Sequence, residues 1–89
     1  MIKTLKFMPY AQARVHTHPT RIWLQSYDTC VAVIDGDWLT INGLYSMTTR
    51  RHLVAFCKEY CGGMQFPTIK MLATQHLRLN LKTGEIENA

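Results

Sequence analysis

The chain has 89 residues, of which 47% are hydrophobic and 18% charged, and its formal net charge is +4. This length fits a single domain over residues 1–89, and the composition excludes a disordered chain. No apolar run approaches the roughly 20 residues of a membrane-spanning helix, and residues 1–9 lack the apolar segment of a signal peptide. Three cysteines, an odd number, then favour reduced thiols and a cytoplasmic location.

The first half of the chain has the pattern of β-strands. Strand-like alternation or β-branched content occurs in five segments: residues 1–8, 14–18, 22–27, 30–34 and 37–41. Pro9 and Pro19 end the first two, since proline cannot donate to a sheet. Asp35-Gly36 is typical of a tight hairpin turn between the last two. The last three segments have the clearest pattern, and we expect an antiparallel meander of three to four strands.

The period of the hydrophobic pattern changes from two to 3.6 after Tyr45. Apolar residues at helical spacing form one stripe: Leu53, Phe56, Cys57 and Tyr60. We therefore predict one main helix whose apolar face lies on the sheet. Ser46 or Thr48 is the expected N-cap, and Gly62-Gly63 is expected to end the helix.

The C-terminal residues predict a short extension of helix and strand. Pro67 suits the first turn of a short helix that runs to about residue 73. Residues 76–82 then alternate, and Thr83-Gly84 is typical of a turn back toward residues 85–87. The predicted fold class is α+β: a meander, one main helix packed on it and this short extension.

The start of the main helix carries an unusual run of polar residues. Three hydroxyl side chains precede three basic ones: Ser46, Thr48, Thr49, Arg50, Arg51 and His52. Cations are unfavourable in the first turn of a helix, so this run predicts a site for an anion, either a phosphate or a partner's carboxylates. The alternative is structural: an arginine pairs with Asp28, Asp35 or Asp37, and His52 packs half-buried against the sheet.

A second group of residues has the composition of a zinc site. His16 and His18 project from one face of a predicted strand, and Cys57 and Cys61 lie one turn apart on the predicted helix. Two histidines and two cysteines are a normal tetrahedral zinc set. Against this, Cys57 already belongs to the apolar stripe, and no motif links the histidines to the cysteines. Zinc is therefore a candidate cofactor with a competing structural explanation.

The aromatic residues offer a third candidate site. Trp23, Tyr27 and Trp38 come from strands that we expect to be neighbours. If their face is open, they could stack on the bases of a single-stranded nucleic acid. The competing interpretation places them in the core beneath the helix.

No residue pattern indicates catalysis. His52 and Cys57 are five positions apart, a spacing that does not place two side chains side by side on a helix. The six carboxylates show no pairing suited to acid–base chemistry, and no phosphate-binding glycine motif is present. We therefore expect a protein that is not an enzyme.

Residues 24–56 resemble a family of small proteins encoded by bacteriophages and mobile elements. The shared motif reads S-Y-x-T at residues 26–29 and Y-S-x-T-T-x-R-H at residues 45–52. This family has no established activity, so the resemblance implies a meander with a helix, and a bacterial cytoplasm as the location. It implies no catalytic residue.

These observations favour a non-enzymatic binding protein. Its most concrete form is an inhibitor of a host defence system, similar to an anti-CRISPR protein, that covers a surface of a host nuclease through Arg50 and Arg51. The alternatives are a basic nucleic-acid-binding module that uses the same cations, or a structural or accessory phage protein.

Overall fold

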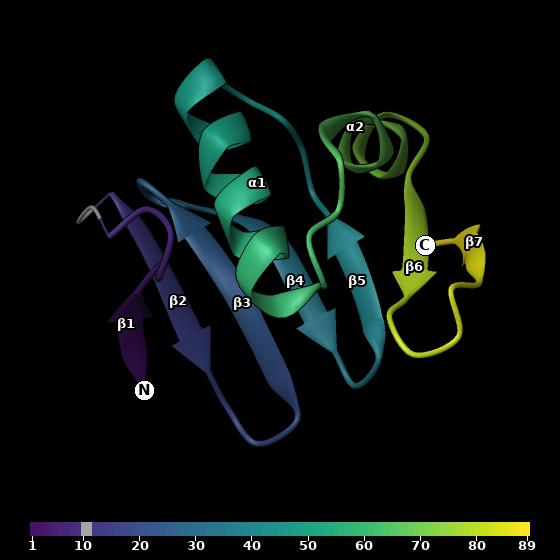
Figure 1. Ribbon diagram of the computed structural model, residues 1–89, viewed down its shortest axis with the longest axis horizontal. Coiled ribbons are helices and arrows are strands. Elements are labelled where there is room, and N and C mark those ends of the chain that lie inside the picture. The colour runs from purple at the N-terminus through teal and green to yellow at the C-terminus, as the bar shows by residue number, and fades with distance from the viewer. Residues whose placement is uncertain (10–11) are drawn as a thin grey trace.

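The computed structural model describes residues 1–9 and 12–89. Within these residues, seven strands form one antiparallel sheet and two helices lie on one side of it (Figure 1). The elements are β1 (Ile2–Thr4), β2 (Ala13–Thr17), β3 (Arg21–Ser26), β4 (Thr29–Asp35), β5 (Trp38–Ile41), α1 (Met47–Tyr60), α2 (Phe66–Thr74), β6 (Leu77–Asn80) and β7 (Ile86–Asn88).

The α+β class is confirmed, but the predicted number of strands is wrong. The sheet has seven strands in sequence order, not three to four. The C-terminal helix and hairpin form as expected, yet they are not a mere extension, because β6 pairs with β5 and continues the sheet. Both helices occupy the connection between β5 and β6, so they rest on a sheet to which both halves of the chain contribute.

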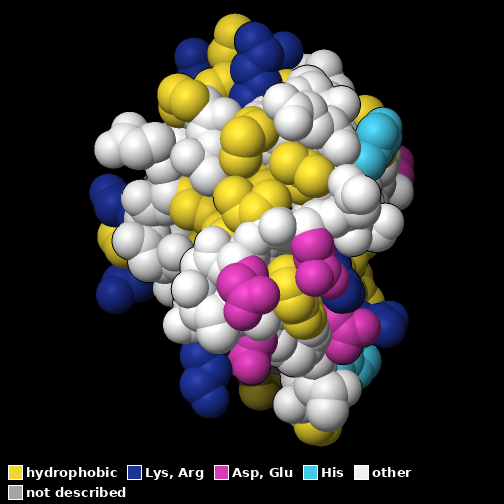
Figure 2. Space-filling view, turned by 90° about the vertical axis from the view of Figure 1, so that its right-hand side faces the viewer, with side chains coloured by type: hydrophobic (Ala, Val, Ile, Leu, Met, Phe, Trp, Pro, Cys, Tyr) yellow, Lys and Arg dark blue, Asp and Glu magenta, His cyan; other side chains and the backbone are white. Residues whose placement is uncertain are grey.

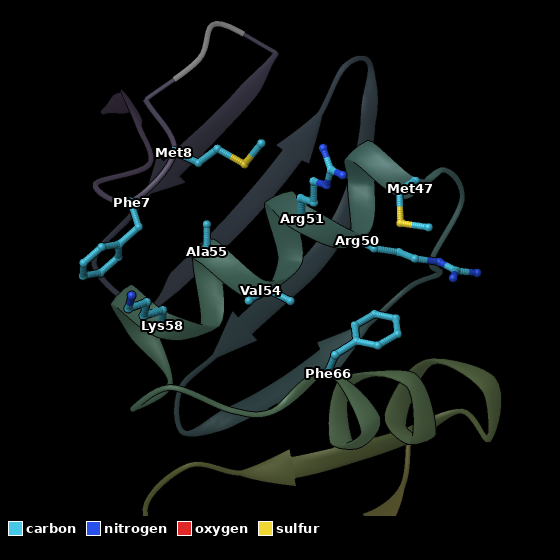
Figure 3. A pocket seen from close by; sticks show the side chains of 9 residues that line it. All are labelled: Phe7, Met8, Met47, Arg50, Arg51, Val54, Ala55, Lys58 and Phe66. Carbon is cyan, nitrogen blue, oxygen red and sulfur yellow. The ribbon is translucent and has the colours of Figure 1, made fainter.

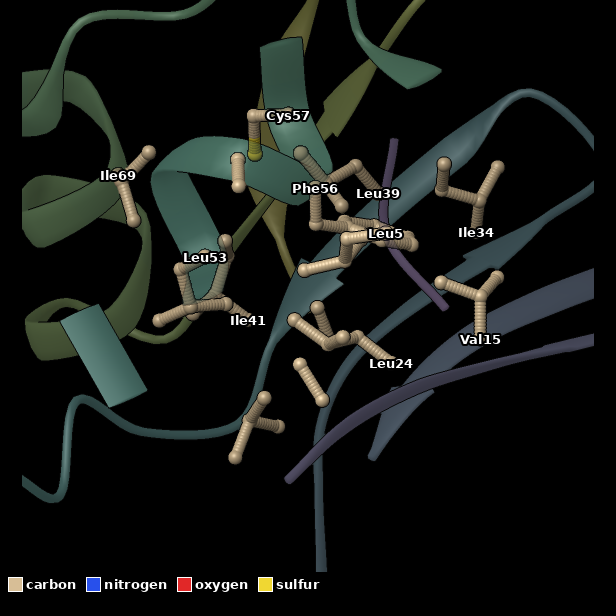
Figure 4. Packing of buried hydrophobic residues seen from close by; sticks show 14 of the residues in the cluster. Leu5, Val15, Leu24, Ile34, Leu39, Ile41, Leu53, Phe56, Cys57 and Ile69 are labelled. Carbon is tan, nitrogen blue, oxygen red and sulfur yellow. The ribbon is translucent and has the colours of Figure 1, made fainter. Parts of the chain in front are cut away.

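The sheet face beneath the helices carries the core. Cross-strand pairing places Val15, Leu24, Ala32 and Ile41 in one row, and all four are buried. Side chains of α1 and α2 pack onto this row and its neighbours (Figure 4). Burying each large apolar side chain contributes about 1.5–3 kcal/mol, so this layer holds the helices in place.

The opposite face of the sheet, which we call the open sheet face, has a different composition. Its central row is formed by successive cross-strand neighbours: His16, Trp23, Val33, Thr40 and Arg78. All five are half-buried, and both described helices lie on the other side of the sheet. These five side chains are therefore half-buried by one another and by other side chains of the same face, not by a helix.

A β-bulge in β4 adjusts the pairing of β3 and β4. Leu24 pairs with Ala32 and Gln25 with Cys30, so Val31 is the extra residue. A bulge lets two consecutive side chains point to the same side of a sheet. Val31 and Ala32 are accordingly both buried.

The two helices are short and partly polar. No helix in the described ranges is long and apolar enough to cross a membrane.

Candidate partner-binding groove

Helix α1 begins with a capped first turn that contains no acidic residue. The Oγ of Ser46 accepts a hydrogen bond from the backbone N–H of Thr49 at 3.2 Å, so Ser46 is the N-cap. Such a cap contributes about 0.5–2 kcal/mol. The first turn holds no Asp or Glu to balance its partial positive charge.

Two of the six residues predicted to bind an anion, Thr49 and His52, are buried in the protein instead. The Oγ of Ser26 lies 2.9 Å from Oγ1 of Thr49 and 2.8 Å from Nδ1 of His52. Ser46 donates to Oγ1 of Thr49 at 3.2 Å. Burial lowers the pKa of His52, so its imidazole is neutral and can accept from Ser26. Ser26, Thr49 and His52 therefore form a buried network, joined at its edge by the exposed Ser46, that anchors α1 to the end of β3.

Arg50 and Arg51 point away from this network, to the outside of the helix. Figure 3 shows Arg50 on the side of Phe66 and Arg51 on the side of Met8. The guanidinium of Arg50 lies 5.7 Å from the centre of the Phe66 ring, a cation–π contact. Thr48 lies beside them and is half-buried. One turn of helix thus divides the six residues between two faces.

The two arginines border a groove along the outer face of α1, which we call the α1 groove. Its volume is about 480 Å³, and its lining residues are Phe7, Met8, Met47, Arg50, Arg51, Val54, Ala55, Lys58 and Phe66. Several apolar side chains remain accessible in it: Met47 is 61% exposed, Phe7 46% and Val54 37%. Helix α1 forms the floor, and the segment after β1 and the start of α2 form the sides (Figure 3).

The lining of the α1 groove includes three cations and no carboxylate. The ammonium of Lys58 lies 4.6 Å from the centre of the Phe7 ring. The Nε of Arg50 is buried without a hydrogen-bond partner. An unbalanced set of cations around an apolar surface suits an anionic, partly apolar ligand.

The ion pairs among the described residues lie elsewhere. Arg21 pairs with Asp35 at 3.2 Å, and Arg78 pairs with Glu87. Of the structural alternative for the helix start, the pairing of Asp35 with Arg50 or Arg51 is wrong because Asp35 pairs with Arg21, whereas His52 does pack inside the protein and is fully buried. Figure 2 views the molecule from the β6–β7 side, where Asp and Glu side chains gather in the lower part of the view. Much of the negative charge thus lies away from the α1 groove.

The structure does not bring the four predicted zinc ligands together. His16 and His18 project from the open sheet face, where both imidazoles stack on Trp23. Cys57 belongs to α1 and is buried on the other side of the sheet, and Cys61 packs against the same core. Within the described residues, no group of three or more His, Cys, Asp or Glu side chains could hold a metal ion.

The aromatic residues are also divided between surfaces. Trp23 and Trp38 lie on the open sheet face and not in the core beneath the helix. Tyr27 is in the β3–β4 turn with a φ of 55°, and its ring lies 5.9 Å from that of His52. The predicted set of three is therefore two residues on the open sheet face and one at the edge of the buried network.

Sequence reasoning missed the apolar part of the α1 groove. Met47, Arg51, Val54 and Lys58 follow steps of four, three and four residues, which places them on one face of a helix. This second stripe lies opposite the core stripe. Phe7 and Phe66 come from distant segments, and the sequence alone gave no reason to join them to it.

The comparisons with known proteins address the family and not an activity. No curated protein and no solved structure matches the chain. A model described as a family of unknown function (DUF8033) matches residues 4–68, which is more than half of the chain. The matched segment contains every residue that lines the α1 groove. The chain therefore belongs to this family of unknown function.

Proposed function

We propose that this protein is a non-enzymatic binding domain whose α1 groove holds an acidic, amphipathic segment of a partner protein. One observation carries the proposal: three cations that pair with no carboxylate of the described residues border an accessible apolar surface. Such a groove complements a segment that presents Asp or Glu side chains beside apolar ones.

The apolar residues and the cations have different roles in this proposal. Burial of Met47, Val54 and Phe7 supplies most of the affinity, because each accessible apolar side chain contributes up to about 1.5–3 kcal/mol when covered. The cations select an acidic partner and speed its approach. Arg50 rests on Phe66, so it loses less side-chain freedom on binding than an unsupported arginine would.

The biological form that we propose is an inhibitor of a bacterial defence system, similar to an anti-CRISPR protein. Support for this form comes from the resemblance of residues 24–56 to phage and mobile-element proteins. A domain of 89 residues can act by covering a surface that a host nuclease needs for its substrate. Docking through the α1 groove requires no catalytic residue.

Nucleic-acid binding at the α1 groove is the alternative use of the same cations. The phosphate backbone is contacted mainly by cations and polar donors. The accessible apolar surface formed by Met47, Val54 and Phe66 would add nothing to such contacts. The apolar content of the groove favours a protein partner.

Affinity capture from a bacterial lysate with matched variants tests the proposal. The groove variant is Arg50→Glu with Arg51→Glu. The control is Lys70→Glu with Lys82→Glu, which makes the same change in net charge at two exposed lysines outside the groove. We expect wild type and control to retain a common protein that the groove variant loses. Equal capture by all three would refute the proposed role of the α1 groove.

A restriction assay tests the inhibitory form separately. We expect expression of the wild type in a CRISPR-immune host to restore phage plating, and the groove variant to fail. Restored plating by the groove variant would assign inhibition to another surface.

A further inference from the structure

The open sheet face carries both tryptophans of the chain, Trp23 and Trp38. Each belongs to a strand whose alternate residues are in the core, so the alternation of the sheet directs both indoles away from the helices. A large aromatic side chain on an uncovered sheet face is a feature that a monomer's core does not require. The surroundings of the two rings show what they could bind.

Trp23 is the centre of a set of parallel rings. The imidazole of His16 stacks on it with a centroid distance of 4.9 Å and an interplanar angle of 6°. The imidazole of His18 does the same at 4.7 Å and 7°. Gln25 fixes His16 through a hydrogen bond of 2.8 Å between Oε1 and Nε2. Three planar rings, from β2, from the residue that follows it and from β3, are thus already held parallel, with the exposed His18 as an accessible member.

Trp38 is covered by a cation. The guanidinium of Arg78 lies 4.1 Å from the centre of its ring. Arg78 also pairs with Glu87, and the neighbouring Arg21 pairs with Asp35. These carboxylate partners are substantially exposed, with Asp35 at 60% and Glu87 at 47%. Exposed ion pairs contribute only about 0–1 kcal/mol, so a phosphate can replace either carboxylate at little cost.

We propose that the open sheet face binds single-stranded nucleic acid by stacking bases on the His16–Trp23–His18 rings and on Trp38. Bases extend or enter the row of parallel rings, and Arg21 and Arg78 contact the phosphates between them. Stacking of one base on an aromatic side chain contributes about 1–3 kcal/mol. The net charge of +4 favours the approach of an anionic chain.

The composition of this face favours nucleic acid over a second copy of the protein. Two sheets pack through interdigitating aliphatic side chains. The central row of the open sheet face contains a single aliphatic residue, Val33, among His16, Trp23, Thr40 and Arg78. A face-to-face dimer would also bring Arg21 and Arg78 toward their own copies. Planar rings beside arginines are instead the combination that single strands use.

Tryptophan fluorescence tests this proposal directly, because both tryptophans belong to the proposed site. The probes are oligo(dT) and oligo(U) of about 12 nucleotides, a length within the usual range for such sites. We expect them to quench the fluorescence of the wild type and to raise the anisotropy of a labelled oligonucleotide. Binding should weaken steeply between about 50 and 200 mM salt.

Variants assign the binding to this face. Trp23→Leu should weaken binding about tenfold, the equivalent of about 1.4 kcal/mol. His18→Ala changes an exposed residue and should weaken binding several-fold even if Trp23→Leu does not fold. Phe7→Leu is the matched control, because Phe7 is an exposed aromatic residue of the α1 groove. It should leave binding unchanged.

Three results would overturn the proposal. The first is the lack of quenching and of anisotropy change with both probes at low salt. The second is binding that Phe7→Leu weakens as much as His18→Ala does. The third is a change in fluorescence with protein concentration alone, together with a dimer in sedimentation, which would place a second copy on this face. The first and third results leave the α1 groove as a site for a protein unaffected, whereas the second would place nucleic acid at the α1 groove.

Discussion

The Oγ of Ser26 lies 2.8 Å from Nδ1 of His52, and this contact joins the end of β3 to the second turn of α1. The two side chains are 2% and 1% exposed. A serine beside a histidine resembles a nucleophile with its base, but no substrate can reach this pair. Ser46 and Thr49 complete the same network. The polar residues of the motif at residues 26–29 and 45–52 thus include a set whose role is to hold the helix on the sheet.

Ser26→Ala should destabilise the protein by about 1–3 kcal/mol, because it leaves buried polar atoms of Thr49 and His52 without a partner. Urea unfolding followed by circular dichroism measures the change. Thr40→Ala is the control, since it removes a half-buried hydroxyl from the open sheet face. A loss no larger than that of the control would mean that the network contributes little.

Acidification should destabilise the wild type through His52. Burial lowers the pKa of this imidazole in the folded state below its ordinary value of 6.5. The unfolded chain therefore binds more protons as the pH falls through and below about 6.5, and stability falls with it. The titration of one group can lower the free energy of unfolding by at most about 1.4 kcal/mol per pH unit.

The measurement compares the free energy of unfolding of wild type and His52→Gln between pH 7.5 and about 5. The variant lacks the titrating group, so its stability should fall less steeply over this range. Parallel pH profiles would show that His52 does not carry the effect.

The sequence predicted the centre of this fold better than its edges. The stripe of Leu53, Phe56 and Cys57 and the cap at Ser46 identified α1, because periodicity and capping are local signals. The segments that hold the edge strands β1 and β7 were singled out in the sequence, but each strand has only three residues, and no local pattern showed that they join the same sheet as the meander. Their pairing depends on neighbours supplied by the rest of the sheet. The strand count was therefore too low.

The residues of the candidate sites do not all lie together, because a local pattern could not tell which way each side chain points. Each helical residue turns by about 100°, so the run from Ser46 to His52 could not face one ligand. Strand alternation likewise sends His16 away from the helices when Val15 is in the core. Arg50 and Arg51, which the sequence singled out as cations that capping does not explain, both line the α1 groove. Their apolar surroundings needed the folded chain.

His76→Gly should stabilise the protein. His76 follows the C-cap of α2 with a φ of 52°, in the left-handed region that favours glycine. Relief of this conformation should add about 0.5–1 kcal/mol to the free energy of unfolding. Thermal unfolding checks it, with His18→Gly in the same protein as a histidine control outside this conformation. A lower melting temperature for His76→Gly would contradict the argument.

Cys57 should resist alkylation in the folded protein. A hydrogen bond with Cys61 and burial raise the pKa of its thiol, and its side chain is inaccessible. Iodoacetamide labelling followed by peptide mass spectrometry should find Cys57 modified only after denaturation. Labelling of Cys57 at the rate of the unfolded chain would contradict its place in the core.

Photo-crosslinking from position 54 tests the central claim most directly. Val54 lies in the α1 groove and is 37% exposed, so a photoreactive phenylalanine derivative there can contact a bound partner. The control places the same group at Lys82, an exposed position outside the groove. We expect a discrete adduct with a bacterial protein from position 54, weak or no adduct from position 82, and loss of the adduct when Arg50→Glu and Arg51→Glu are added. A partner that co-purifies but crosslinks from position 82 and not from position 54 would contradict the account.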